Sequence, residues 1–184
     1  MKYKSKNPRT LKKVQGKFKF CPKCGHKLVL KNLDGHKRLV CQNKKCQFIF
    51  YQNSKPTASA IITKGNKVLL TKRAVEPKKG YWDAPGGFLE KDEHPEAGLK
   101  REMREELSVE IKIIRPLGIY MGEYLQEHPE STLNLYYLAK IKKGKIRPAD
   151  DITEARWFSK DEIPQRLAFK NNRQAIRDWQ EMKK

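Results

Sequence analysis

The stretch that decides the fold is residues 86–109, which read GGFLEKDEHPEAGLKREMREELSV and are called the box below. The box opens with a glycine pair, and its second half carries acidic side chains around Arg101. Glu102, Glu105 and Glu106 are spaced i, i+3 and i+4, so a helix projects their carboxylates from one face. The pattern predicts a loop followed by a helix over residues 95–107, with Pro95 in its first turn.

Carboxylates this close together need a counter-ion, because like charges at these spacings destabilise a helix. Arg101 can pair with Glu105 one turn later, but one guanidinium cannot neutralise Glu93 and the three helical glutamates together. A divalent cation is the natural counter-ion, and all-oxygen ligands favour Mg2+ or Mn2+ over Zn2+.

The box resembles the Nudix hydrolase signature G-x5-E-x7-R-E-U-x-E-E-x-G-U, in which U is a bulky apolar residue. The positions that match in register are Gly87, Glu93, Arg101, Glu102, Met103, Glu105, Glu106 and Val109. A solvated helix with intrahelical salt bridges is the alternative interpretation. The family's last glycine is Ser108 here; a left-handed backbone is expected there, with a positive φ and a strain of roughly 1 to 2 kcal/mol.

The resemblance implies an α/β fold, a sandwich of helices on both sides of a mixed sheet. It also implies hydrolysis of a nucleoside diphosphate joined to another group, such as ADP-ribose, NAD(H) or a related dinucleotide, with Mg2+ or Mn2+. Divalent ions suit this reaction because a pyrophosphate repels hydroxide until its oxygens are neutralised. The candidate metal ligands are Glu93, Glu102, Glu105, Glu106 and, from an acidic loop at 150–154, Glu154.

Within that chemistry, we expect Glu105 to take the proton from water, and Arg101 to orient the carboxylates by salt bridges. The candidate substrate contacts are Arg73, Trp82, Gly87 and Tyr120. Trp82 and the tyrosines at 120 and 124 could equally be core residues, because aromatic side chains in strands usually pack inside. The glycine pair would let the backbone approach substrate and metal.

Four cysteines precede this region as Cys21-x2-Cys24 and Cys41-x4-Cys46. Each pair can aim two sulfurs at one point, and strands predicted at 26–31 and 37–40, joined by a turn at 32–35, bring the pairs together. The pattern looks like a zinc ribbon with a structural Zn2+ site. Two disulfides are the alternative, which a reducing compartment disfavours. His26 and His36 are expected at the surface.

The chain divides into three predicted segments. Residues 1–19 form a flexible basic arm, residues 20–54 form the zinc ribbon and its linker, and residues 55–184 form the Nudix domain. In that domain, strands are expected at 57–63, 67–72, 110–115, 117–125 and 132–142, with a turn at 128–131. A short helix from 159 to 163 and an amphipathic helix over 172–182 are expected near the end. Ala97, Leu99, Met103 and Leu107 should line the inner side of the box helix.

The composition gives a net charge of +20, from 41 lysines and arginines against 21 acidic residues. Such a field attracts polyanions, so nucleic acid is a candidate partner beside the nucleotide substrate, and a homodimer is another. No apolar run is long enough to cross a membrane, and the basic start is not followed by the apolar segment of a signal peptide. We therefore expect a cytoplasmic protein.

The substrate stays open at this level. A four-cysteine ribbon before a Nudix domain looks like the NADH pyrophosphatase branch, but the SQPWPFPxS motif of that branch is missing from residues 119–131. ADP-ribose-type members carry a proline where this sequence has Leu125. The alternatives to a small dinucleotide substrate are an RNA cap, or an RNA-binding or regulatory module that hydrolyses nothing.

Overall fold

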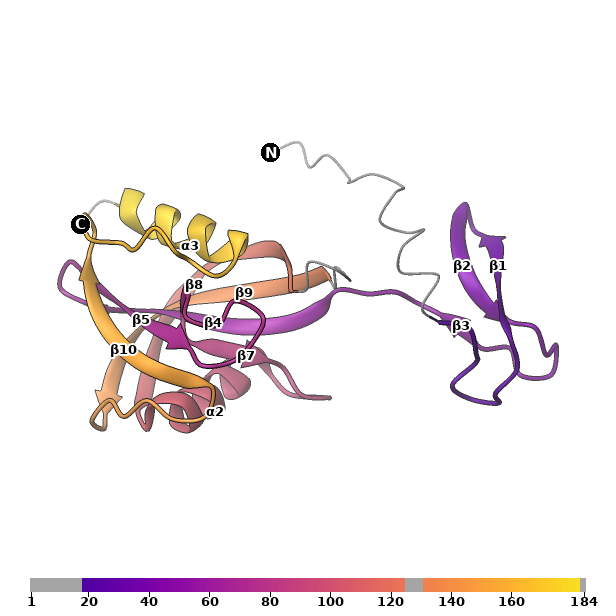
Figure 1. The fold of residues 1–184 in the computed structure, drawn as a ribbon, viewed down its shortest axis with the longest axis horizontal. Coiled ribbons are helices and arrows are strands. Elements are labelled where there is room, and N and C mark those ends of the chain that lie inside the picture. Colours follow the sequence, from indigo (N-terminus) through magenta and orange to yellow (C-terminus); the bar gives the residue numbers. More distant parts are fainter. Residues whose placement is uncertain (1–17, 125–130, 183–184) are drawn as a thin grey trace. The chain divides into compact units, whose positions relative to one another are not determined.

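The computed structural model describes residues 18–124 and 131–182. These residues form two compact units, a small one that ends at Asn53 and a larger one that begins at Ser54. Each unit is considered separately here (Figure 1). Most of the predicted basic arm, residues 1–17, lies outside the described residues, as do residues 128–130 of the predicted turn.

The small unit is a three-stranded antiparallel sheet formed by β1 (Leu28–Leu33), β2 (His36–Cys41) and β3 (Ile49–Phe50). We call residues 18–53 the ribbon unit. The turn between β1 and β2 consists of Asp34 and Gly35, both at positive φ, a conformation that glycine adopts without steric cost. The predicted hairpin is therefore confirmed, and His26 and His36 are exposed as expected.

The larger unit is built on a mixed sheet in the order β10-β5-β4-β9-β8. Its strands are β4 (Lys55–Lys64), β5 (Lys67–Arg73), β8 (Glu110–Glu123), β9 (Ser131–Lys143) and β10 (Ile152–Ser159). β4 and β9 run parallel, and the neighbouring pairs are antiparallel. Two short strands, β6 (Trp82–Asp83) and β7 (Gly86–Phe88), pair with β5 and β4.

Two helices cover opposite faces of this sheet (Figure 1): α2 (Pro95–Leu107) and α3 (Lys170–Glu181). Leu99, Met103 and Leu107 of α2 pack with one set of buried sheet residues. Ala175, Ile176 and Trp179 of α3 pack with another set. Alternation along β4 separates the faces, since Ala60 and Ile62 belong to the α2 side and Ile61 to the α3 side. The predicted α/β/α sandwich is confirmed.

The ends of α2 are fixed by local hydrogen bonds. At the start, the His94 Nδ1 accepts from the Glu96 backbone N–H at 3.3 Å. At the end, Ser108 has φ 56° and ψ 34°, and the N–H groups of Ser108 and Val109 donate to the carbonyls of Arg104 and Met103. The positive φ predicted for Ser108 is confirmed, so the helix ends as the signature requires even without glycine.

The structure corrects several local predictions. Residues 159–163 form the end of β10 and a turn rather than a helix, and Ala97 is exposed on α2. The strands expected at 110–115 and 117–125 are one strand, β8, with register shifts on both sides of Pro116. Proline has no N–H to donate to the ladder, so the pairing with β9 shifts register around Pro116, and the strand continues beyond it.

The sequence predicts a loop at Glu154, but this residue lies within strand β10. In the described part of the chain, neither helix is long and apolar enough to cross a membrane.

Candidate active site and zinc centre

The glycine pair of the box is held against the edge of β4. Gly86 is paired with Ser59 and Gly87 with Ala58. At Gly86, φ is 137° and an added Cβ would collide with the Ala58 carbonyl oxygen. At Gly87, an added Cβ would lie 2.5 Å from the Glu102 Oε1. Gly86 is thus required by the close approach of the β4 backbone, whereas a side chain at Gly87 would force the Glu102 carboxylate to move.

Arg101 holds three carboxylates at once. Its Nε and Nη2 donate to the two oxygens of Glu93, each at 3.0 Å. Its Nη1 donates to Glu102 and to Glu105, each at 2.8 Å. The Arg101 guanidinium and the Glu90 backbone N–H lower the pKa of Glu93 to about 2. The predicted pair with Glu105 is present, and Arg101 extends the same contact to Glu93 and Glu102.

Glu106 points away from Arg101 into the interior. It is 6% exposed and accepts a hydrogen bond from the Gly86 backbone N–H at 3.1 Å. Burial raises the pKa of Glu106 well above its usual range, and the negative charges of Glu102 and Asp151 raise it further. Burial also raises the pKa of Glu102, against the opposing effect of Arg101. Among the described residues Glu106 has no cationic partner, and Glu102 shares Arg101 with two other carboxylates, so the site favours a bound cation.

Asp151 is a site residue that the sequence interpretation missed. Its charge raises the pKa of both Glu102 and Glu106. The preceding loop reaches the box because the Arg147 and Ala149 N–H groups donate to the carbonyls of Leu107 and Glu106, at 3.0 and 2.9 Å. The available signal was the acidic pair Asp150-Asp151 in the loop at 150–154, from which the sequence interpretation named Glu154 alone.

Glu154 lies in β10 opposite Lys72, and the two side chains form an ion pair at 3.5 Å. Both side chains are well exposed. A surface salt bridge was the alternative to a metal-binding role for Glu154. Exposed pairs of this kind contribute little to stability. The metal role of Glu154 stays a prediction.

Arg73 and Trp82 lie in the paired strands β5 and β6, which precede the box in the chain. Arg73 pairs with Asp83 at 3.4 Å, donates to the Pro77 carbonyl at 2.8 Å, and lies over the Phe169 ring. Burial raises the pKa of Asp83 to about 6, although Arg73 opposes the shift. Trp82 contacts Phe158 edge to face, which agrees with its expected core role.

The two tyrosines have different surroundings. The Tyr120 hydroxyl donates to Asp178 of α3 at 2.6 Å, and its ring packs on Tyr136 in the α3-side core. Tyr124 instead contacts Phe88 of the box and stacks on Phe169. The structure therefore brings Tyr124 to the box, and it places Tyr120 in packing with α3.

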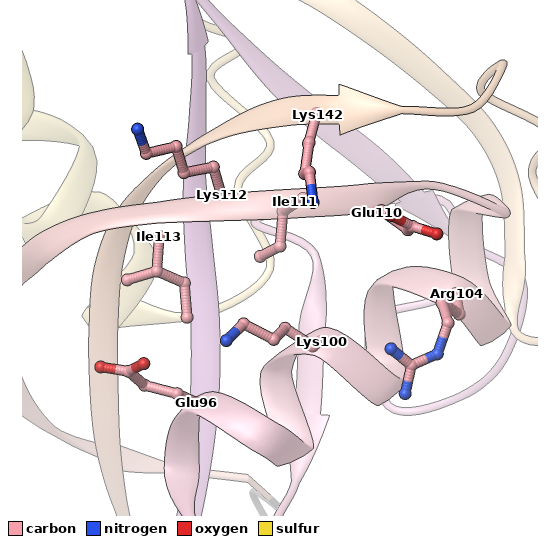
Figure 2. A pocket seen from close by; sticks show the side chains of 8 residues that line it. All are labelled: Glu96, Lys100, Arg104, Glu110, Ile111, Lys112, Ile113 and Lys142. Atoms are coloured by element: carbon pink, nitrogen blue, oxygen red, sulfur yellow. The ribbon is translucent and has the colours of Figure 1, made fainter.

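A cavity of about 610 Å³ lies along the other flank of α2 (Figure 2). Its lining combines two acidic, four basic and two apolar side chains from α2, β8 and β9: Glu96, Lys100, Arg104, Glu110, Ile111, Lys112, Ile113 and Lys142. None of the candidate metal ligands lines it. This cavity is thus separate from the carboxylate cluster of the box.

The four cysteines of the ribbon unit converge on one point. Their sulfurs all lie within 4.8 Å of one another, with Cys21 and Cys46 at 3.7 Å and Cys24 and Cys41 at 3.4 Å. A tetrahedron of sulfurs about 2.3 Å from zinc has edges of about 3.8 Å. The distances therefore fit a structural Zn2+ site, and all four cysteines are free rather than joined in disulfides.

The box offers a different donor set. Within the described part of the chain, no three acidic residues have carboxylate oxygens as close together as these four sulfurs. Mg2+ keeps several waters and uses one or two protein carboxylates together with substrate phosphates. An all-oxygen, acidic and partly open site of this kind fits Mg2+ or Mn2+ better than zinc.

Comparison with known proteins agrees with both centres. The family model described as "NUDIX domain" matches residues 53–180, and the one described as "Nudix N-terminal" zinc ribbon matches residues 19–52. The chain is similar to a solved NUDIX hydrolase from Nitrosomonas europaea, with 32% identity, a TM-score of 0.75, and coverage of 89% of this chain and 90% of that one.

Curated relatives give two further similarities. One is the NAD-capped RNA hydrolase NudC of Pseudomonas syringae pv. syringae (strain B728a), 31% identical over 79% of this chain and 49% of that protein. The other is an ADP-ribose pyrophosphatase of Methanocaldococcus jannaschii, 29% identical over 80% of this chain and 85% of that protein. The chain spans about half the length of the NudC relative.

The two family models cover the two centres. The carboxylates around Arg101 lie within the NUDIX match, and the four cysteines lie within the ribbon match. The chain belongs to the Nudix family and carries the zinc ribbon that precedes the catalytic domain in some of its members.

Proposed function

We propose that the protein hydrolyses the diphosphate bond of a nucleoside diphosphate joined to another group, in the presence of Mg2+ or Mn2+. The observation that carries this proposal is the arrangement of Glu93, Glu102 and Glu105 on Arg101, with Glu106 buried behind the glycine pair. A domain that only binds has no need to gather this much negative charge.

The residues that would hold the cation are Glu102, Glu105 and Glu106, with Glu93 and Glu154 as further candidates. The cation supplies charge neutralisation at the phosphate oxygens and a more acidic attacking water. Arg101 keeps the glutamate side chains in place, so that they are organised before substrate binds. Glu93, whose carboxylate is occupied by Arg101 and the Glu90 N–H, acts through Arg101 in this arrangement.

Glu105 is our candidate for the general base. Its side chain is 49% exposed, unlike those of Glu102 and Glu106, so water can reach it directly. Its contact with Arg101 fixes one carboxylate oxygen and leaves the other for the proton. Asp151 is a second candidate for this role, because its charge acts on two of the box glutamates.

The substrate contacts proposed from the sequence are Arg73, Trp82, Gly87 and Tyr120. Gly87 lies in the box itself. Arg73 and Trp82 lie in β5 and β6 just before it in the chain, and Tyr120 contacts Asp178 of α3. The rings of Phe88 and Tyr124, 5.1 Å apart beside Gly87, offer a nearer apolar surface for a base.

The two kinds of curated relative narrow the substrate class. An NAD cap and ADP-ribose share an adenosine diphosphate that is joined to a second group. We therefore propose such an ADP-linked compound, either ADP-ribose or NAD(H), as substrate. Hydrolysis of an NAD cap on RNA is the second candidate, and it is favoured by the basic ribbon unit.

The test compares the wild type with Glu105→Gln in Mg2+, using ADP-ribose, NADH, a dinucleoside polyphosphate and NAD-capped RNA, with nucleotide products measured by chromatography. We expect wild-type turnover of at least one compound and a loss of about 100-fold or more in kcat for Glu105→Gln. Glu110→Gln is the matched control, since it removes an exposed carboxylate outside the box and should stay active.

A wild type that released no product from any compound, while Mg2+ did not bind, would contradict the proposal. The regulatory or RNA-binding alternative would then stand. Homodimer formation and a cytoplasmic location stay predictions, which sedimentation velocity and cell fractionation can check.

A further inference from the structure

The ribbon unit has two unlike sheet faces. Because directly paired residues share a face, Leu30, Leu39 and Phe50 lie together on one side. The Phe18 ring lies 4.5 Å from the Phe50 ring, and Leu39 is buried. This side is apolar, with Leu39 buried and Leu30 and Phe18 partly exposed.

The opposite face combines three half-buried aliphatic side chains, Val29, Val40 and Ile49, with polar and aromatic groups. Lys31 and Arg38 are directly paired on this side. The Arg38 guanidinium lies over the Tyr51 ring, with its Cζ 4.7 Å from the ring centroid. Tyr51 is 56% exposed, so a large part of this ring is open to solvent. We call Lys31, Arg38 and Tyr51 the platform.

The charge around the platform is strongly positive. Residues 18–53 contain eight lysine and arginine side chains and a single acidic one, Asp34. One carboxylate cannot pair with eight cations inside the unit. Zn2+ with four thiolates carries two negative charges, and these leave the ribbon unit with a clear positive excess.

We infer that the platform binds single-stranded RNA, with a base stacked on the Tyr51 ring and Arg38 plane and with Lys31 on the phosphates. Flat aromatic and guanidinium groups among scattered cations are what unpaired bases and their backbone require. A membrane surface would instead contact exposed aliphatic tips, and the aliphatic side chains on this face, Val29, Val40 and Ile49, are half-buried. The binding is a property of the ribbon unit and does not depend on hydrolysis.

The test measures anisotropy of a fluorescein-labelled single-stranded RNA of about 12 nucleotides with the full zinc-loaded chain and no added Mg2+, so that catalysis does not interfere. We expect Tyr51→Ala to weaken binding about 5- to 150-fold, which corresponds to the loss of one stacked base. Tyr51→Phe keeps the ring and should bind within about twofold of wild type.

Two charge variants distinguish RNA binding at the platform from attraction of RNA to the positive charge of the whole protein. Lys31→Ala should lower the slope of log affinity against log salt by about 0.7, the value for one phosphate contact on a single strand. Lys145→Ala removes an exposed lysine from the larger unit and should change the affinity for this RNA much less. Zinc content shows that the ribbon variants remain folded, and tryptophan fluorescence shows the same for Lys145→Ala, since all three tryptophans lie in the larger unit.

Three results would overturn the inference: no RNA binding by the wild type, equal binding by Tyr51→Ala and wild type, or binding to phosphatidylserine vesicles but not to RNA. Since no step requires turnover, these results are distinct from failure of the proposed hydrolysis. Tight RNA binding by a protein inactive on all four nucleotide compounds would support this inference and contradict the other.

Discussion

At the scale of single residues, Arg101 determines the geometry of the box. Five N–H groups on a rigid plane let one guanidinium contact Glu93, Glu102 and Glu105 together, which a lysine ammonium on a flexible chain cannot reproduce. Glu106 is excluded from this arrangement and is held by a backbone N–H instead. The four glutamates of one motif therefore have two different kinds of partner, the Arg101 guanidinium for three of them and a backbone N–H for Glu106.

Gly87 is the residue whose replacement tests the contact between strand and carboxylate. A methyl group there would lie 2.5 Å from the Glu102 Oε1, so Gly87→Ala should displace Glu102 and lower kcat at least tenfold. Gly65→Ala, whose Cβ would meet no atom within 4 Å in the turn between β4 and β5, is the control outside the box. Equal activity of Gly87→Ala and wild type would show that Glu102 is free to move without loss.

Asp83 gives a pH-dependent stability with a defined sign. Its pKa is raised from 3.8 to about 6, so folding is favoured by this group below pH 4 and the contribution is lost as the pH rises to about 6. The shift corresponds to roughly 2 to 3 kcal/mol. Asp83→Asn should flatten that part of the pH profile.

The measurement is urea unfolding followed by tryptophan fluorescence between pH 4 and 6.5. All three tryptophans, Trp82, Trp157 and Trp179, lie in the larger unit, so the signal does not include the ribbon. A wild-type profile identical to that of Asp83→Asn would mean that Asp83 remains ionised without cost.

At the scale of elements, the end of α2 depends on one strained residue. Ser108 adopts φ 56°, which costs a non-glycine residue about 1 kcal/mol. Ser108→Gly should therefore raise the free energy of unfolding by about 1 kcal/mol, measured by urea unfolding with tryptophan fluorescence. Ser108→Ala keeps the strain and is the control; a gain in that variant as large as in Ser108→Gly would rule out backbone relief.

The loop after β9 shows how elements far apart in sequence complete the box. Arg147 and Ala149 donate backbone hydrogen bonds to the last turn of α2, whose carbonyls have no partners inside the helix. This docking carries the chain to Asp151 beside Glu102 and Glu106. The loop thus supplies hydrogen-bond donors to the last carbonyls of α2, and it brings Asp151 as a fifth carboxylate to the four glutamates of the box.

At the scale of the whole molecule, the two units have different sources of stability. The ribbon unit has few buried apolar residues and depends on its four sulfurs, whereas the larger unit has an extensive core on each side of its sheet. A zinc chelator should therefore unfold the ribbon unit and leave the larger unit folded.

This can be measured by adding a zinc-selective chelator and recording far-UV circular dichroism, released zinc and tryptophan fluorescence together. One zinc per chain should be released with loss of strand signal, while the tryptophan emission stays native. Cys41→Ser should reproduce the effect without chelator. Simultaneous loss of the tryptophan signal would mean that the larger unit requires the ribbon to fold.

Features that depend on local spacing could be predicted from the amino-acid order alone. The i, i+3 and i+4 glutamates, Pro95 at the helix start and the two cysteine pairs predicted α2, the carboxylate face and the zinc site, because neighbours along a helix or hairpin have fixed geometry. Ser108 was predicted at positive φ from its place after the last helical turn. Alternating and apolar runs predicted most strands.

Only the tertiary structure decided which distant residues complete the site. Asp151, Phe88 with Tyr124, and the burial of Glu106 against the Gly86 backbone N–H depend on how strands and loops pack, and no spacing along the chain encodes that. Glu154 was assigned to a loop because its acidic neighbours hid the start of β10. The spacing of residues along the chain predicts the motif itself. The burial and charge around the motif depend on contacts between segments distant in sequence.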